Sequence, residues 1–357
     1  MPNRREILSK TDPSLAEAGR MAVRTCLGTT KDDVVTLVAD DIGRPVVAAM
    51  LAAVDEIGAP VSAFALEQCG KRPLSRLPPE IVAALEKSTV SVLVVTPLAG
   101  ELRVRRQLLD VVHRRNLRHA HLVQVGAEAF RHGMRADYQA IHALQDRLLA
   151  VLPDASRVRV SSPGGTALDV TFDPSLRWVR ANGLIQPAAW QNLPSGQVFT
   201  CPASINGLYV VDGSIGDWFA GKYPDLPDYP VTLEFADDRL RDVRSDNTAL
   251  ARELFLYFRS NENGDRAGEF GVGTNPWLHF LSGEHLLNEN VPGVHLALGD
   301  PFGHETGATW TSKTRVSVIG TRMSLFADDR PLIDAGTFLP DILGDLVVGP
   351  PPDPAAP

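Results

Sequence analysis

The sequence has few cysteines and no long apolar segment. Its three cysteines, Cys26, Cys69 and Cys201, are isolated along 357 residues and form neither a disulfide framework nor a C-x-x-C zinc motif. We therefore expect reduced thiols. No apolar run reaches the roughly 20 residues that a membrane span needs, and the opening residues MPNRREILSKTDPSLAEAG lack the apolar core of a secretory signal. These absences predict a cytoplasmic protein that does not span a membrane.

Positive charge is also scarce. Lysine and arginine total 35 against 43 aspartates and glutamates, which gives a net charge of −8 and argues against nucleic-acid binding. Residues 103–121 concentrate six arginines with His113, His119 and His121. This stretch lacks interleaved aromatic residues for base stacking, and its histidines do not have the i, i+4 spacing of a helical metal pair. We interpret it as a solvated helix face and expect no nucleic-acid partner.

Motifs of several enzyme classes are missing. The sequence contains no G-x-G-x-x-G after the first predicted strand, no phosphate-binding P-loop, no G-x-S-x-G and no H-E-x-x-H. Asp40 and Asp41 follow the first predicted strand, where open α/β sheets bind ligands, but we interpret them as helix-capping residues. Cys201 and Ser195 have no identifiable catalytic partners, and we expect Cys201 to be a buried thiol.

Regular alternation of strands and helices fills residues 33–152. Apolar runs predict strands over 34–39, 61–66, 90–95 and 121–125, and helical patterns cover 46–57, 78–87, 101–115 and 138–152. Such alternation is typical of a mostly parallel sheet with helices on both faces. The sequence therefore predicts an α/β domain over residues 1–153.

The pattern becomes β-rich after Pro153. Two-residue alternation predicts hairpins within 157–172 and 231–243, a strand pair at 314–319 and 323–327, and one helix at 247–259. We expect a β-rich α+β domain over residues 154–348. The proline-rich end, GPPPDPAAP, has no core residues, which predicts a disordered tail at 349–357.

Several segments of the second domain, taken in order, resemble the aminopeptidase T family of metallopeptidases. They are GTALDVTFDP, NLPSGQVFTCP, GLYVVDGSIG, GEFGVGTNP and VPGVHLALGD, which begin at residues 165, 192, 207, 268 and 291. They are also similar to a branch with the same fold that opens dihydroxypyridine rings with one non-haem iron. The resemblance implies a two-domain fold, metals in the β-rich domain, and a homodimer.

The resemblance also implies a set of metal ligands. The family's first three ligands correspond to Glu269, Glu289 and His295 in this sequence. Its last pair, H-x-D, is missing, and our alignment places Thr314 and Val316 at those two positions. A valine cannot ligate a metal, so the alignment predicts a site that has lost two ligands. The loss of the pair is firm, because no histidine follows His304 in the sequence.

Three further residues near these positions also disfavour metal binding. Gln197 replaces a family glutamate, and Lys313 and Arg315 bring positive charge, which opposes metal binding. Our first hypothesis is a catalytically degenerate protein without a cofactor. It binds a peptide or peptide-like ligand in the former active-site cleft, with Gln197, Lys313 and Arg315 as contacts. An accessory role in the biosynthesis of modified-peptide natural products is one setting for such a protein.

Two other hypotheses remain open. In the second, Glu269, Glu289, His295 and His304 form a rebuilt site for one divalent metal (zinc, cobalt, manganese or ferrous iron), or His295, His304 and Glu269 form an iron triad. The protein would then be an active aminopeptidase or ring-cleaving dioxygenase. In the third, the chain is a scaffold or dimerisation module without a small ligand.

Overall fold

The computed structural model describes residues 7, 9–96, 98, 100–223, 226–278 and 285–346. The chain forms two compact units, Met1–Gln139 with Gly183–Ser195, and Ala140–Asn182 with Gly196–Pro357. The division lies earlier than the boundary predicted at 153–154. The reason is helix α8 (Tyr138–Leu149), which contributes Leu144 and Leu148 to the apolar core of the second unit. The tail predicted at 349–357 lies outside the described residues.

The first unit is built on one parallel sheet. Its strand order is β2-β1-β3-β4-β8, and every pairing is parallel. The five strands are β1 (Val35–Ala39), β2 (Val61–Ala65), β3 (Val90–Val95), β4 (Arg118–Val123) and β8 (Trp190–Asn192). β1 and β3 are buried along their whole length, which explains their continuous apolar sequences. The predicted parallel sheet is confirmed, although β4 begins three residues before the predicted strand at 121.

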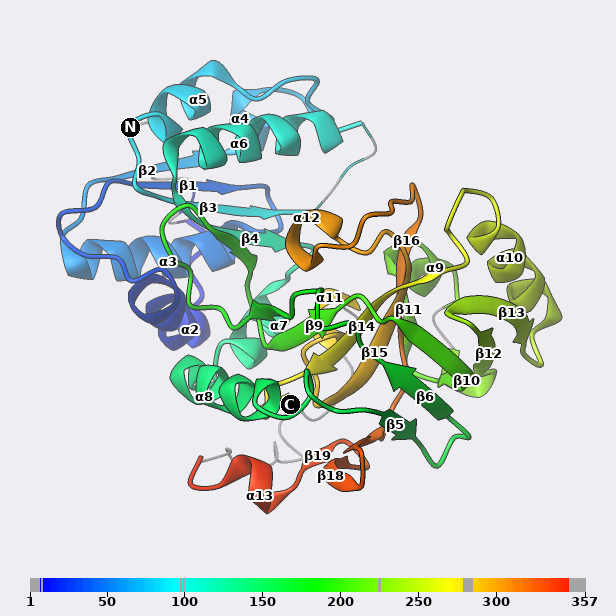
Figure 1. Ribbon diagram of the computed structural model, residues 1–357. Coiled ribbons are helices and arrows are strands. Elements are labelled where there is room, and N and C mark those ends of the chain that lie inside the picture. Colours follow the sequence, from blue (N-terminus) through cyan, green and yellow to red (C-terminus); the bar gives the residue numbers. More distant parts are fainter. Residues whose placement is uncertain are drawn as a thin grey trace. The chain divides into compact units, whose positions relative to one another are not determined.

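Helices cover both faces of this sheet (Figure 1). On one face, α5 (Pro79–Leu85) and α6 (Leu102–Arg115) pack against side chains of β1 and β3. On the other, α3 (Arg44–Ile57) packs beside α2 (Ala16–Arg20). Pro45 lies in the first turn of α3, and Gly58 ends the helix in the left-handed conformation (φ 80°). Shorter helices in this unit are α4 (Leu66–Cys69) and α7 (Ala127–Gly133).

The carboxyl end of β1 is a structural network. The Oδ1 atom of Asp40 accepts a hydrogen bond from the Gly43 backbone at 2.8 Å, at the start of α3. Its Oδ2 atom accepts from Arg72 at 2.9 Å and from the Thr96 backbone at 2.6 Å. Asp40 is 1% exposed. Asp40 therefore holds the loop before α3, but the N-cap residue of α3 is Gly43 and no side chain caps it, so the predicted capping by Asp40 and Asp41 is not observed.

Two of the histidines expected on a solvated helix face are instead buried in strand β4. His119 is fully buried, with its Nδ1 atom 2.8 Å from the Ser91 hydroxyl and its Nε2 atom 3.1 Å from Nδ1 of His121. His121 also contacts the edge of Trp190 on β8. The prediction was wrong for these two residues because α6 ends at Arg115 and the chain then enters the sheet; His113, on the helix, is exposed.

The buried histidine pair predicts a pH dependence of stability. Burial lowers the pKa of His119, and burial with the nearby Arg105 charge lowers the pKa of His121 to about 4. The unfolded chain takes up these protons at higher pH than the folded chain. Stability should therefore fall as the pH drops below about 6.5, by about 1.4 kcal/mol per pH unit for each such group. Denaturant unfolding between pH 7.5 and 4.5 measures this slope.

Two histidine variants separate the contribution of His121 to this pH dependence from that of an exposed histidine. His121→Gln removes one titrating group and keeps an amide able to hydrogen-bond to His119, so the slope should become shallower. His113→Gln, on the exposed face of α6, should leave the slope unchanged. Equal slopes in wild type and His121→Gln would contradict the assignment.

The second unit contains two antiparallel sheets. Sheet B has the order β13-β12-β10-β6-β5-β17-β18-β19, and sheet C has the order β11-β16-β15-β14-β9-β7. Sheet B consists of β5 (Val158–Ser161), β6 (Ala167–Thr171), β10 (Ser204–Val211), β12 (Val231–Ala236), β13 (Arg239–Arg244), β17 (Ser324–Ala327), β18 (Arg330–Asp334) and β19 (Thr337–Phe338). Sheet C consists of β7 (Val179–Ala181), β9 (Gln197–Thr200), β11 (Ser214–Ile215), β14 (Ala267–Gly273), β15 (Gly293–Gly299) and β16 (Arg315–Ile319).

The core of this unit takes apolar side chains from both sheets and from helix α10 (Thr248–Phe258). The helices α9 (Asp217–Lys222), α11 (His285–Asn288), α12 (Gly303–Thr306) and α13 (Pro340–Leu343) are short. The β-rich character and the α10 helix agree with the predictions. The strands predicted at 314–319 and 323–327 are present as β16 and β17, but their predicted pairing is wrong, because β16 belongs to sheet C and β17 pairs with β5 and β18 in sheet B.

None of the helices in the described part of the chain combines the length and the apolar character that crossing a membrane requires.

Candidate functional site

One face of sheet C carries charged and polar residues. β14, β15 and β16 are neighbours, and their register places Glu269 opposite Ala297, and Ala297 opposite Ser317. Because side chains alternate along a strand, Glu269, His295, Arg315 and Ser317 share one face of the sheet. The opposite face is apolar and lies in the core, with Phe270, Val272, Leu296, Leu298, Val316 and Val318. We call the polar side the site face.

A bulge in β14 aims Glu269 at the site face. The pairing with β15 shifts between Ala267 and Glu269, so that one extra residue, Gly268, stands in β14. Both Ala267 and Phe270 lie in the core although they are an odd number of residues apart. Gly268 is needed here, since a Cβ atom would lie 2.1 Å from the Gly299 carbonyl oxygen. The bulge thus reverses the alternation and turns Glu269 away from the core.

Glu269 forms a buried cluster with His295 and Arg315. Its Oε1 atom lies 3.2 Å from Nε2 of His295, and its Oε2 atom accepts a hydrogen bond from Arg315 at 2.6 Å. Arg315 also donates to the Asp300 carbonyl oxygen at 3.0 Å and stacks on the Phe302 ring, 3.6 Å from its centroid. Both oxygens of the carboxylate are therefore engaged, and the guanidinium is fixed from three sides.

The charge of Glu269 depends on these partners. Its side chain is 2% exposed, and burial alone would favour the neutral acid. The Arg315 guanidinium and the hydrogen bond from His295 outweigh burial and lower the pKa of Glu269 to about 2. Glu269 is therefore an ionised carboxylate in the interior, balanced by Arg315.

Glu289 forms a second cluster on the site face. Its Oε1 atom accepts a hydrogen bond from the Ser317 hydroxyl at 2.5 Å, and its Oε2 atom accepts one from the Gln197 amide at 3.3 Å. The other amide atom of Gln197, Oε1, is buried with no hydrogen-bond partner among the described residues. Asn288, beside Glu289, donates to Ser214 at 3.3 Å. Gln197 and Glu289, both predicted from the sequence, thus meet in space.

Thr314 and Val316, which our alignment places at the H-x-D positions, do not lie on the site face. Val316 is part of the apolar core, and the Thr314 hydroxyl accepts a hydrogen bond from Asn261 at 3.0 Å. Arg315 and Ser317 stand in their place beside Glu269 and Glu289. Successive residues of a strand face opposite sides of the sheet, so a register one residue later would bring both H-x-D positions onto the site face. Lys313, predicted to contact a ligand, is exposed before β16 begins.

His304 does not join the two clusters. It is exposed on α12, where its carbonyl oxygen accepts a hydrogen bond from Arg177 at 2.7 Å. No set of three or more His, Cys, Asp or Glu side chains within the described ranges is placed to hold a metal ion. The predicted four-residue metal site with Glu269, Glu289 and His295 is therefore not assembled.

Cys201, which the sequence predicted as a buried thiol, is 2% exposed, and burial raises its pKa to about 11. This prediction is confirmed, and Cys201 is a poor nucleophile at neutral pH.

Gly271 provides the space for the His295 ring. It lies opposite His295 in the β14–β15 pair, and a Cβ atom there would be 2.1 Å from Nε2 of the imidazole. Nε2 is the atom that contacts Glu269. The glycine, inside a motif that sequence reasoning treated only as a source of ligands, is thus a positioning residue for the cluster.

Gly271→Ala should therefore displace His295 and break its contact with Glu269. We expect the free energy of unfolding to fall by about 1–3 kcal/mol, the usual cost of overpacking a rigid interior. Denaturant unfolding measures the loss. The same substitution in a His295→Ala background should cost much less, because the clash is gone.

Gly221→Ala is the control, since a Cβ atom at this α9 position meets nothing within 4 Å. If Gly271→Ala lowers the free energy of unfolding equally in the wild type and in His295→Ala, the clash with the imidazole does not cause the loss.

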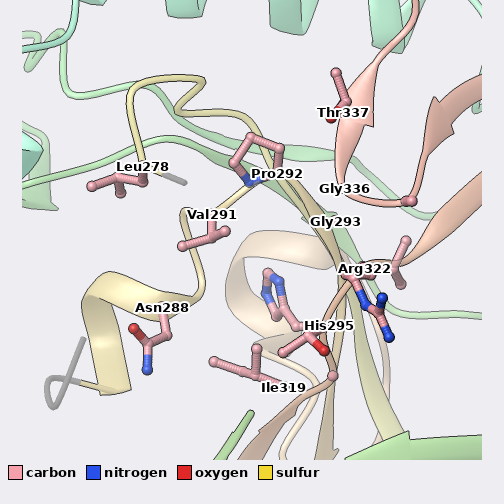
Figure 2. A pocket seen from close by; sticks show the side chains of 14 residues that line it. Leu278, Asn288, Val291, Pro292, Gly293, His295, Ile319, Arg322, Gly336 and Thr337 are labelled. Atoms are coloured by element: carbon pink, nitrogen blue, oxygen red, sulfur yellow. The ribbon is translucent and has the colours of Figure 1, made fainter. Parts of the chain in front are cut away.

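A cavity of about 280 Å³ adjoins the first cluster through His295 (Figure 2). Its walls come from the segment before β15, from β15 itself, from the turn after β16, and from the β18–β19 turn. The lining residues are Leu278, Asn288, Val291, Pro292, Gly293, Val294, His295, Ile319, Gly320, Thr321, Arg322, Ala335, Gly336 and Thr337. Sequence reasoning did not find this cavity, because its walls come from distant parts of the chain.

Two solved structures are similar to this chain in fold. No family model matches the sequence, and no curated protein matches it. The 2,5-dihydroxypyridine dioxygenase from Pseudomonas putida KT2440 aligns with a TM-score of 0.66 at 17% identity, covering 92% of this chain and 98% of that one. Wild-type AmpT from Thermus thermophilus aligns with a TM-score of 0.64 at 14% identity, covering 91% and 99%. The chain therefore has, at a distant level, the fold shared by AmpT and this dioxygenase.

Proposed function

We propose that this protein is a catalytically degenerate relative of the aminopeptidase T-like proteins that binds a peptide or peptide-like ligand in the cavity beside His295. The observation that carries the proposal is the ion pair between Arg315 and Glu269. A guanidinium stands against the carboxylate that the family resemblance assigns to a metal. The protein would then retain the fold and a binding cavity, but use neither a metal nor metal-dependent chemistry.

The donor set does not fit a divalent metal. Glu269 has both oxygens engaged, by His295 and by Arg315. A cation held beside a potential ligand repels a metal ion, and the contacts of Arg315 with Asp300 and Phe302 keep it there. Replacing Arg315 by a metal would therefore require breaking all of these contacts. We derive no catalytic step through a metal at this site.

The Glu289 cluster fits a metal no better. Its two carboxylate oxygens are bonded to Ser317 and Gln197, which are a hydroxyl and an amide. Neither is a preferred ligand for zinc or ferrous iron. The hydrogen bonds hold Glu289 in a fixed orientation on the site face, which is a structural role.

The cavity supports the binding half of the proposal. Ligand sites are typically concave and apolar with a few polar groups, and here Leu278, Val291 and Ile319 are combined with Asn288 and His295. A volume of about 280 Å³ is near the lower limit of small-molecule sites. It suits a small ligand or one end of a longer one. The homodimer and the biosynthetic setting remain predictions, the first testable by light scattering after gel filtration.

Two measurements on the purified full-length protein test the proposal. Mass spectrometry after incubation with zinc, cobalt, manganese and ferrous iron should find less than one tightly held metal per chain. Calorimetric titration with a panel of N-acetylated tripeptides should detect binding to at least one member. One metal per chain, lost in His295→Ala, would overturn the degenerate site and favour the rebuilt-enzyme hypothesis. Absence of binding across the panel would overturn the peptide ligand.

A further inference from the structure

The cavity beside His295 has one cationic side chain in its wall, Arg322. Among the described residues that form this wall there is no aspartate or glutamate. Arg322 is exposed, in the turn between β16 and β17, and forms no ion pair with any residue that the structure describes. A cavity with this lining attracts an anion.

Arg322 and two of the apolar lining residues lie on different sides of the cavity. Figure 2 shows Arg322 on one side and Leu278 and Val291 on the other, with Asn288 below them and with His295 and Ile319 between the two sides. Such a division suits a ligand with a negative group at one end and an apolar body. The guanidinium of Arg322 can bind a carboxylate through two parallel hydrogen bonds.

The lining also determines which end of a peptide fits. A free amino terminus needs a carboxylate partner, and the two carboxylates of the site face, Glu269 and Glu289, are already bonded to other side chains. A free carboxyl terminus needs a cation, which Arg322 supplies. The carboxyl end is therefore the one that this cavity can neutralise.

We propose that the cavity binds the free C-terminal carboxylate of its peptide-like ligand through Arg322, with the last side chain packed against Leu278 and Val291. This inference rests on the proposed peptide-binding function and adds the orientation and the chemical class of the ligand. It makes Arg322 the specificity-determining residue. A volume of about 280 Å³ accommodates the terminal residue and leaves the rest of the peptide outside.

The test compares two probes that differ in one group. N-acetyl-Gly-Gly-Leu is titrated into the full-length protein as the free acid and as the C-terminal amide. We expect the acid to bind at least tenfold more tightly, and this preference to shrink when salt is raised from 50 to 500 mM. In Arg322→Gln the acid and the amide should bind with equal, weak affinity.

Arg330→Gln is the matched control, because Arg330 is an exposed arginine at the start of β18 that does not line the cavity. It should keep the full preference for the acid. Equal binding of acid and amide to the wild type overturns the carboxylate inference and leaves peptide binding in place. If neither this pair nor the tripeptide panel binds, the proposed function itself fails. If Arg322→Gln does not fold, the comparison of acid and amide binding to the wild type still tests whether the cavity binds a carboxylate.

Discussion

Replacing Arg315 by histidine together with Ser317 by aspartate should turn this protein into one that binds divalent metal. The two substitutions place an H-x-D pair, the pair that the resemblance to the aminopeptidase T family implies as metal ligands, at the positions that face Glu269 and Glu289. They remove the cation and add two ligands, so Glu269, Glu289 and His295 become available. We expect at least one metal per chain with a dissociation constant of about 1 μM or tighter, roughly −8 kcal/mol. Metal titration followed by mass spectrometry measures this change.

The alignment derived from the sequence supplies the control. Thr314→His with Val316→Asp introduces the same two residues one position earlier, on the opposite face of β16. Val316 is 6% exposed in the core, so this pair should bind no metal and should severely destabilise the protein. Metal binding by the shifted pair, or none by the first pair, would show that the residues facing Glu269 and Glu289 have been assigned to the wrong side of the strand.

Removing Arg315 alone should strongly lower the free energy of unfolding. In Arg315→Met, Glu269 becomes a buried carboxylate without its counter-charge, a situation that costs about 3 kcal/mol even when the lost partner is partly exposed. Denaturant unfolding at pH 8 measures the loss. A second substitution, Glu269→Gln, should recover much of it, because the uncompensated charge is then gone.

The direction in which the stability of Arg315→Met changes with pH shows whether the buried charge of Glu269 causes the loss. Without Arg315, burial becomes the main influence on Glu269 and raises its pKa above the unfolded value of about 4.3. The folded state then retains a proton that the unfolded state has lost, so stability falls as the pH rises above about 4.3. The difference between wild type and Arg315→Met should therefore be smaller at pH 5 than at pH 8. Lys313→Met removes an exposed cation two residues away and should change stability by less than about 0.5 kcal/mol.

If Arg315→Met were as stable as the wild type, the ion pair would not be needed to keep Glu269 ionised. The argument against a metal at this position would then lose its electrostatic basis, and the rebuilt-enzyme hypothesis would need renewed testing.

The sequence was most informative about single strands and helices whose own hydrophobic pattern identifies them. The continuous apolar runs of β1 and β3 identify strands buried on both faces, and the helical spacing of α3 and α6 was recognised to within two residues. These features depend on local chemistry, which is readable along the chain. The division between the units was not readable in this way, since α8 is amphipathic whichever core it joins.

The residues of the site were identified in part. Glu269, His295, Glu289 and Gln197 were expected together, and the structure brings them onto one face of sheet C. On β16 the alignment pointed to Thr314 and Val316, whereas the structure places Arg315 and Ser317 beside the two glutamates. The period of a strand is two residues, and β16 contains no glycine or proline that would indicate which residues face the site. The effect of the Gly268 bulge on Glu269 was equally hidden, since a bulge is defined by the strand it pairs with.

By itself, the sequence determined that this protein has an α/β unit and a β-rich unit, and that no histidine follows His304 to form an H-x-D pair. Both follow from residue types and their order. Only the tertiary structure decided that Arg315 neutralises Glu269, that Gly271 makes room for His295, and that a cavity opens beside it. Those features depend on contacts between segments that are distant in sequence. Such contacts produce no periodic pattern of residues that could be recognised in the sequence.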